Sequence, residues 1–350
     1  MRRSNQQLKT SSFVVQWEFI LLLIFILFNF IMSFTHSNYL RISNLFDTTF
    51  IFSEKALVAL IMTFIIITGN IDISVASMMG LSSVVLATLF RAGMNIWLAS
   101  LVGLGVGTFC GFLNGFIITR VRLPALIITL ANFSFYRGIA YVILGDEAVS
   151  GFPESFLYLG RGYIGNSPVP FILVFFIVLA VIAGIVLHRT KFGRTVYAIG
   201  WNENTCYASG IPVDRIKLLL FTLSGFMAGV AAVFITSRIG NTRPNIATGF
   251  ELEIITIVIL GGVMITGGVG KMWGVFLSIF LIGTIRYGLG LHNIPGQYML
   301  IVTGSLLIIS ILMNNLIVSY VEQRYLKAMA ALEQGEDLPV EPAVEKGGGT

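Results

Sequence analysis

The stretch FGRTVYAIGWNENTCYASGIPVDRIK, Phe192 to Lys217, is the longest polar segment between hydrophobic runs in this 350-residue chain. It has the pattern of a short helix. Asn202 is a favourable N-cap, Glu203 places negative charge in the first turn, and Gly210 can take the left-handed conformation that ends a helix before Pro212. Because isolated helices shorter than ~12–15 residues are marginal in water, this one must be held by its flanking spans or by a partner surface.

On both sides of this stretch the chain is strongly apolar. It is 56% hydrophobic and only 11% charged, which leaves too little polar surface to cover a soluble globule. We therefore expect an all-α, polytopic integral membrane protein. Runs of spanning length predict about ten transmembrane helices, near 17–35, 55–69, 72–90, 95–119, 124–144, 169–187, 217–236, 251–268, 272–290 and 297–318.

These runs predict three regions: a cytoplasmic segment at 1–16, a transmembrane domain at 17–320 with a polar loop at 188–217, and a cytoplasmic, disordered tail at 321–350. If the N-terminus lies inside, most basic residues fall in inner segments, as the positive-inside rule requires. The net charge of +5 is therefore interpreted as a signal for orientation rather than for nucleic-acid binding. The two cysteines have no metal-ligand spacing, and we expect no metal site.

The stretch that opens this section resembles the loop FGR…YAIG.N…A…SGI of the sugar-permease family of bacterial ATP-binding-cassette (ABC) importers. That branch moves ribose, xylose, arabinose, galactosides, rhamnose and autoinducer-2, and its loop carries a cytoplasmic helix that couples to the ATPase. Trp201 and Thr205–Cys206 depart from the pattern. For the pattern alone, the alternative is an ordinary short helix. The resemblance implies an ATPase-coupling site formed by Gly193, Arg194, Tyr197, Gly200, Asn202, Glu203, Ser209 and Gly210.

A second motif, TGNIDISVAS at 68–77, interrupts the apolar sequence and resembles the family signature GG.D.S.GS, with Asn70 and Ala76 in place of glycines. A carboxylate at membrane depth is costly, so Asp72 should face a protein interior or cap a helix N-terminus. The alternative is a cap at the membrane surface.

The predicted span at 124–144 carries Asn132 and Tyr136 four residues apart, hence on one helix face, followed by Arg137. It is similar to a TL…RG element of the family. We assign Asp72, Asn70, Asn132, Tyr136 and Arg137 to the substrate pathway; the alternative for Arg137 is to extend to the outer headgroups. In the preceding span, glycines at 103, 107, 111 and 115 predict close helix packing.

In the second half, GFELEIITIVILGGVMITGGVGKMWG at 249–274 resembles the family pattern GyEL…A..ViGG…GG.G…G. The segment Gly268 to Lys271 lacks the spacing and hydroxyl of a phosphate loop. We therefore expect no nucleotide site or cofactor in this chain, no enzymatic activity of its own, and ATP on a partner subunit. The order of breaks and spans also indicates a weak parallel internal repeat.

Outside the membrane, residues 145–168 are too long for a tight turn and predict an ordered cap. Arg161, Arg238 and Arg243 are expected to dock a binding protein there.

The resemblance implies a permease subunit for a small sugar of the rhamnose or autoinducer-2 class, in the bacterial inner membrane with both termini cytoplasmic. Its partners would be ABC ATPase subunits, a second permease that is the same or homologous, and an extracytoplasmic sugar-binding protein. The alternatives are a secondary transporter or a membrane sensor. Against a secondary transporter, the sequence suggests essentially one intramembrane acid, Asp72, which is meagre for a proton relay.

Overall fold

The computed structural model describes residues 2–36 and 39–312. The chain forms two compact units, Met1–Leu307 and Ile308–Thr350, and the fold described below is that of the first. The predicted tail at 321–350 lies outside the described residues. Residues 2–16 of the predicted N-terminal segment are part of the first helix.

Helices dominate the described residues, which confirms the all-α, polytopic prediction. Among them, seven helices are long and apolar enough to cross a membrane. They are α1 (Arg2–Thr35), through its part Trp17–Thr35, α2 (Ile42–Ile67), α4 (Ile96–Val121), α5 (Ala125–Leu144), α7 (Phe171–Arg189), α10 (Val213–Ile239) and α12 (Met272–Leu291). Two shorter apolar helices are α3 (Val75–Arg91) and Gln297–Leu312.

The predicted span at 251–268 is wrong. There the chain forms α11 (Phe250–Leu260), a helix of 11 residues, followed by an irregular loop at 261–271. In that loop Gly262, Gly267, Gly268 and Gly270 all have positive φ, a conformation that ends a right-handed helix. The hydrophobic run is long enough to span, but its glycines break it.

The loop at 261–271 has a counterpart between α2 and α3, at 68–74. The two loops touch, because a Cβ added to Gly267 would lie 2.7 Å from the nitrogen of Gly69. Next to this contact, the backbone N–H of Gly268 donates to the carbonyl oxygen of Ile67, the last residue of α2, at 2.8 Å. Two interruptions far apart in the sequence therefore meet within the bundle. The parallel repeat inferred from their similarity stays a prediction.

Helices α4 and α10 pack through small residues, as the glycine stripe predicts. A Cβ added to Gly107 would lie 2.7 Å from the carbonyl oxygen of Gly225, and one added to Gly111 would lie 2.7 Å from the Gly225 nitrogen. Without a hydrophobic driving force between helices in lipid, such close backbone approach supplies the packing.

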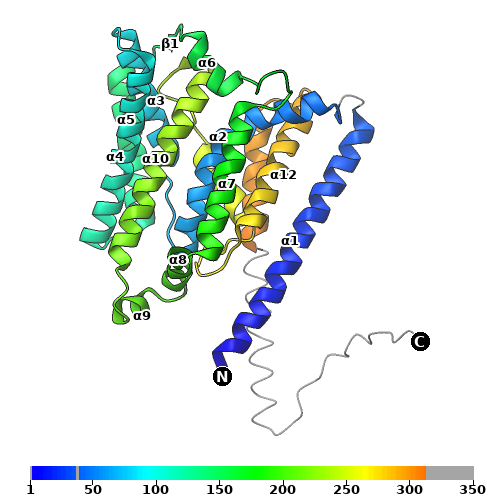
Figure 1. Ribbon diagram of the computed structural model, residues 1–350, viewed down its shortest axis with the longest axis vertical. Helices are drawn as coiled ribbons and strands as arrows, with labels where there is room; N and C mark the ends of the chain where they lie inside the picture. The colour runs from blue at the N-terminus through cyan, green and yellow to red at the C-terminus, as the bar shows by residue number, and fades with distance from the viewer. Residues whose placement is uncertain (1, 37–38, 313–350) are drawn as a thin grey trace. The chain divides into compact units, whose positions relative to one another are not determined.

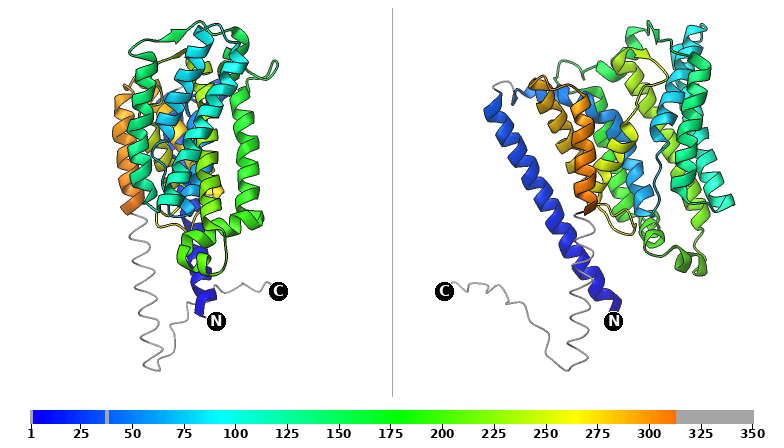
Figure 2. Two further views of the ribbon diagram at one scale, coloured as in Figure 1. Left: turned by 90° about the vertical axis from the view of Figure 1, so that its left-hand side faces the viewer. Right: turned by 180° about the vertical axis from the view of Figure 1, so that it is seen from behind.

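The two ends of the bundle carry different elements (Figures 1 and 2). At one end lie α6 (Glu154–Arg161) and the strand pair β1 (Val149–Ser150) and β2 (Asn241–Thr242), which is antiparallel. This confirms an ordered cap at 145–168. At the opposite end lie α8 (Lys191–Trp201) and α9 (Glu203–Ala208).

Candidate functional site

The polar segment at 190–212 forms two helices where the sequence analysis predicts one. Helix α9 is the predicted helix: the Asn202 side chain accepts from the N–H of Thr205 at 2.8 Å, and Gly210 has φ +76°. Helix α8 was missed. Its signals are a Thr190 N-cap, whose hydroxyl accepts from the N–H of Gly193 at 3.2 Å, and the buried pair Val196 and Ile199 at helical spacing.

One side of this two-helix segment faces away from the bundle. Trp201 is 58% and Tyr207 is 42% exposed, and Arg194 is exposed as well. Cys206 is buried. Burial, and then the nearby Glu203, raise the pKa of its thiol. The surface that a partner could contact is therefore aromatic and basic, and Cys206 is not part of it.

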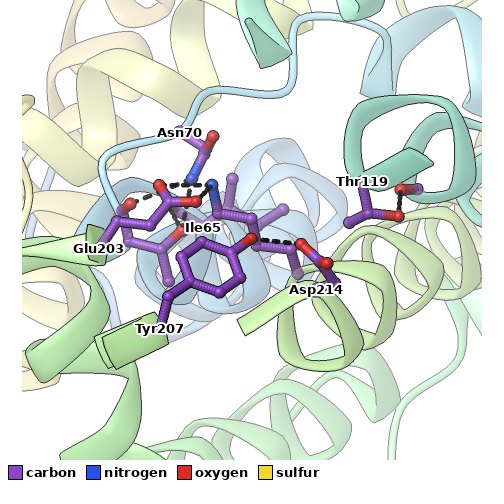
Figure 3. A network of polar contacts seen from close by, with 9 residues as sticks. Ile65, Asn70, Thr119, Glu203, Tyr207 and Asp214 are labelled. Atoms are coloured by element: carbon purple, nitrogen blue, oxygen red, sulfur yellow. Dashed lines mark hydrogen bonds and ion pairs between the residues drawn. The ribbon is translucent and has the colours of Figure 1, made fainter. Parts of the chain in front are cut away.

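Two polar contacts tie α9 to the first turns of α10. The Tyr207 hydroxyl donates to the Asp214 carboxylate, and the two side chains point toward each other in Figure 3. Lys217 contacts both carboxylate oxygens of Glu203 at 2.7 Å. Burial and the bond to Asp214 raise the pKa of Tyr207 to about 12, so its hydroxyl remains a donor at neutral pH. A displacement of α9 would therefore pull on α10.

Helix α8 is anchored on its inner side. Gly193 lies against the last turn of α7, where an added Cβ would overlap the carbonyl oxygen of Leu187. The Tyr197 hydroxyl donates to the carbonyl oxygen of Gly270 at 2.6 Å, and burial raises the pKa of this tyrosine. Of the predicted coupling residues, Gly193, Tyr197 and Gly200 thus face the bundle, whereas Arg194 is exposed.

Asp72 is fully buried, so its carboxylate faces the protein interior. One carboxylate oxygen accepts from the N–H and hydroxyl of Ser74 at 3.0 and 2.6 Å, and the other accepts from the Ser224 hydroxyl at 2.9 Å. Asp72 therefore holds Ser74, the residue before α3, inside the protein and joins it to Ser224 of α10.

The chain of polar contacts continues from Ser74 to α4 and α5. Asn114 donates to the Ser74 hydroxyl at 2.7 Å, and its carbonyl oxygen accepts from Asn132 at 2.6 Å and from Tyr136 at 2.9 Å. The prediction that Asn132 and Tyr136 share one face is confirmed. The structure joins both to Asp72 through Asn114.

Asn70 lies outside this chain, since its side-chain amide donates to the backbone and hydroxyl of Thr68. The side chain of Arg137 turns into the protein, in contrast to the alternative that it extends to the outer headgroups. Its guanidinium donates to the carbonyl oxygens of Pro244, of Ile246 at 2.9 Å and of Ala76 at 3.2 Å. Arg137 therefore holds the segment before α11 against α3.

The three arginines predicted to dock a partner have different environments. Arg161 donates to the carbonyl oxygens of Arg238 and Ile239 at 2.6 and 2.8 Å, capping the end of α10. Arg238 pairs with the fully buried carboxylate of Glu54. Arg243 is exposed. The sequence does not predict that Arg238 pairs inward, because the residue follows an apolar run and its partner Glu54 is distant in the chain.

A set of buried ion pairs was also missed. Lys55, fully buried in α2, contacts Glu253 of α11 at 2.6 Å, and Arg286 of α12 contacts the other oxygen of Glu253 at 2.7 Å. The inference of essentially one intramembrane acid is wrong, because Glu54 and Glu253 are buried as well. The sequence contained a signal, because Glu54 and Lys55 lie at the start of the apolar run that predicts a span at 55–69. That predicted span covers only part of α2, so the two residues seemed to lie at its edge.

Comparison with known proteins matches residues 44–311 to the family described as branched-chain amino acid transport system / permease component. The ribose import permease protein of Bacillus subtilis is 35% identical over 74% of this chain and 81% of its own length. The autoinducer 2 import system permease protein of Yersinia enterocolitica is 34% identical over 84% of this chain and 90% of its own. The L-arabinose transport system permease protein of Escherichia coli is 33% identical, over 75% and 79%. No solved structure matches.

Proposed function

Because the chain belongs to this family of permease components, we propose that it is the membrane-spanning subunit of an ABC importer for a small sugar or sugar-like molecule. The observation that carries the proposal is the two-helix segment at 190–212. This segment packs against α7, α10 and the loop at 261–271, and the side chains of Trp201 and Tyr207 stay exposed. Such a surface suits a partner that delivers energy to a chain with no phosphate loop of its own.

We assign the partners to the two ends of the bundle. ATPase subunits would contact the end with α8 and α9, which is then the cytoplasmic end. The cytoplasmic location of both termini stays part of the proposal. A sugar-binding protein would contact the end with α6 and β1, and a second permease, the same or homologous, would complete the complex. Closure of the ATPases on ATP would bring the two coupling segments together and rock the helices from outward-open to inward-open.

For the substrate, we propose an uncharged, polyhydroxylated molecule of the autoinducer-2 class. The relatives named above import ribose, arabinose and autoinducer 2. Rhamnose remains the alternative on the sequence resemblance alone.

A secondary transporter is the competing function, and the buried acids remove one argument against it. However, Glu253 is paired with Lys55 and Arg286, and Glu54 is paired with Arg238. Paired acids suit a structural role better than a proton relay, which needs groups that exchange protons with water.

The test is uptake into proteoliposomes that contain this chain, the ATPase that co-purifies with it and its binding protein. Labelled autoinducer 2, rhamnose, ribose and arabinose are compared with and without internal ATP, and with a protonophore. We expect ATP-dependent uptake that the protonophore leaves unchanged. Uptake that needs no ATP and collapses with the protonophore would establish the secondary transporter instead.

Contact with the ATPase is tested by cross-linking. In a background with Cys110→Ser and Cys206→Ser, Tyr207→Cys should form an adduct with an ATPase cysteine. Glu147→Cys is the matched control, since its side chain is exposed but lies in the cap segment. Equal adducts at both positions, or none at Tyr207→Cys in the assembled complex, would exclude docking at α9.

A further inference from the structure

We propose that a set of contacts between main chains transmits movement of α8 to both halves of the bundle, and that Gly200 and Tyr197 are its positioning residues. We call this set of contacts the loop junction. It is formed by Ile67 at the end of α2, Gly69 in the loop that follows, Gly200 in α8, and Gly267 and Gly268 in the loop before α12. The proposal rests on the proposed function and extends it to the path by which force enters the membrane domain.

The first contact of the loop junction satisfies a backbone group that the helix cannot satisfy itself. At the end of α2, the N–H groups of Thr68, Gly69 and Asn70 bond the carbonyls of residues 64 to 66. The Ile67 carbonyl accepts instead from the N–H of Gly268 at 2.8 Å. Because an unpaired buried carbonyl is costly, the end of α2 and the loop at 261–271 are coupled through their main chains.

The second contact brings α8 against this hydrogen bond. A Cβ added to Gly200 would overlap both the Ile67 carbonyl oxygen and the Gly268 nitrogen, and the Ile67 carbonyl carbon would lie 3.0 Å away. On the other side, Gly268 lies against Trp201, where an added Cβ would be 3.2 Å from the Trp201 nitrogen. The backbone of α8 therefore touches the last residue of α2 and the loop at 261–271, without side chains between them.

The two loops also touch each other directly. Gly267 has φ +84°, and a Cβ added there would lie 2.7 Å from the nitrogen of Gly69. A side chain at this position would meet both a strained backbone and a neighbouring main chain. Close approach of three backbones is thus a requirement of the loop junction.

Flanking contacts hold the loop at 261–271 on two sides. Toward α8, the Tyr197 hydroxyl donates to the Gly270 carbonyl oxygen at 2.6 Å. Toward α1, the Trp17 indole donates to the Leu260 carbonyl oxygen at 2.9 Å, and Lys271 contacts Glu18 at 3.2 Å. The loop lies between a helix that meets the ATPase in the proposed complex and a helix at the rim of the bundle.

The position of the loop junction in the chain explains its effect. Helix α3 begins a few residues after Gly69, and α12 begins a few residues after Gly268. When α8 is displaced, the backbone starts of both helices must follow, because close-packed interiors transmit displacement rather than absorb it. The loop junction would thus move an element of each half of the bundle together.

The main test is Gly200→Ala, with Gly105→Ala as the matched control. Both glycines are helical, but a Cβ on Gly105 meets nothing within 4 Å. In the purified complex with its ATPase, we expect Gly200→Ala to speed amide hydrogen exchange in the peptides 64–70 and 264–270 alike. Uptake should fall by about tenfold, with the complex still assembled. Gly105→Ala should match the wild type in every measurement.

A second pair of variants, with smaller changes, tests the proposal if the Gly200→Ala protein does not insert into the membrane. Tyr197→Phe removes only the bond to Gly270, and Tyr298→Phe is the control at an exposed tyrosine. We expect Tyr197→Phe to speed exchange in 264–270 and to lower binding-protein-stimulated ATP hydrolysis by about threefold.

Unchanged exchange in both peptides, or normal uptake with altered exchange, would overturn the loop junction as a positioning element. Failure of the proposed function would look different. Wild-type uptake would then be independent of ATP, although the exchange pattern of Gly200→Ala could still be measured.

Discussion

At the residue scale, the interior of this protein is organised by polar side chains that bind main-chain or hydroxyl groups. Asp72 accepts three hydrogen bonds from Ser74 and Ser224, and no basic residue among the described ones forms an ion pair with it. A buried carboxylate with three donors is satisfied without a cation. Its main contribution is therefore to hold the break before α3 against α10.

Two replacements of Asp72 distinguish the effect of its hydrogen bonds from the effect of its charge. Asp72→Ala leaves the donors of Ser74 and Ser224 unsatisfied and should destabilise the chain by about 1–3 kcal/mol. Asp72→Asn keeps one acceptor oxygen, and the Ser224 hydroxyl can turn to accept from the new amide, so assembly with the ATPase should persist. Thermal unfolding of the complex in detergent measures both.

If the charge serves the transport cycle, Asp72→Asn should also lower the stimulation of ATP hydrolysis by the binding protein. Wild-type uptake and stimulation in Asp72→Asn would retire that role and leave Asp72 a structural cap.

Arg137 provides a second prediction at this scale. Its guanidinium spans three carbonyl oxygens in two segments, which the compact ammonium of lysine cannot do. Arg137→Lys should therefore speed hydrogen exchange at 243–249. Arg91→Lys is the control, because Arg91 forms an exposed ion pair whose contribution is small. Equal exchange in the two variants would contradict the anchoring role of Arg137.

At the element scale, the segment at 190–212 depends on its ends. Helix α9 has six residues, so it cannot be stable alone. Its N-cap Asn202, its left-handed residue Gly210 and its ties to α10 position it instead. The exposed face of α9 is then fixed relative to the bundle rather than free to rotate.

The role of Gly210 in ending α9 can be tested with two replacements that differ in how well they tolerate a positive φ. A Cβ at Gly210 meets nothing within 4 Å, and φ is +76°, so the only penalty is backbone strain. Gly210→Val should lower ATP-driven uptake with membrane insertion intact, because a β-branched residue disfavours positive φ. Gly210→Asn should retain most uptake, since Asn tolerates this conformation. Equal uptake in the two variants would remove backbone conformation as the cause.

At the scale of the whole molecule, buried ion pairs connect helices that are distant in sequence. Lys55 and Glu253 join α2 to α11, Arg286 adds α12, and Glu54 joins α2 to α10 through Arg238. Lys55 also lies over the Phe250 ring, 4.6 Å from its centroid. These pairs link α2, α10, α11 and α12 inside the bundle.

Breaking the central pair should be costly. Glu253→Gln leaves Lys55 and Arg286 without their carboxylate, and removal of one partner of a buried pair typically costs about 3–5 kcal/mol. The additional change Lys55→Met should restore part of the loss. Folded yield and thermal unfolding of the single and double variants measure the coupling. Glu147→Gln, in the exposed pair with Arg91, should change stability little, and an equal loss there would argue against a special role for burial.

A further prediction at this scale concerns the charge of Arg243 at the surface where the binding protein is proposed to dock. Arg161 and Arg243 are both exposed and form no ion pair within the described residues, but the Arg161 side chain donates to the carbonyl oxygens of Arg238 and Ile239, which leaves Arg243 for this test. Arg243→Glu should slow capture of the binding protein at low salt and less so at high salt, because exposed charges steer association and are screened. Capture rates that do not change at low salt would exclude Arg243 from the interface.

Sequence alone determined the class of the protein and the cap residues of α9, because these depend on local composition and on side chains close in the chain. It also placed Asn132 and Tyr136 on one face, since helical periodicity is local. Only the tertiary structure decided that the apolar run after Glu251 is broken, that Lys55 pairs with Glu253, and that Gly200 touches both the end of α2 and the loop at 261–271. Those contacts join residues distant in sequence, and hydrophobicity does not specify which distant backbones and charges become neighbours.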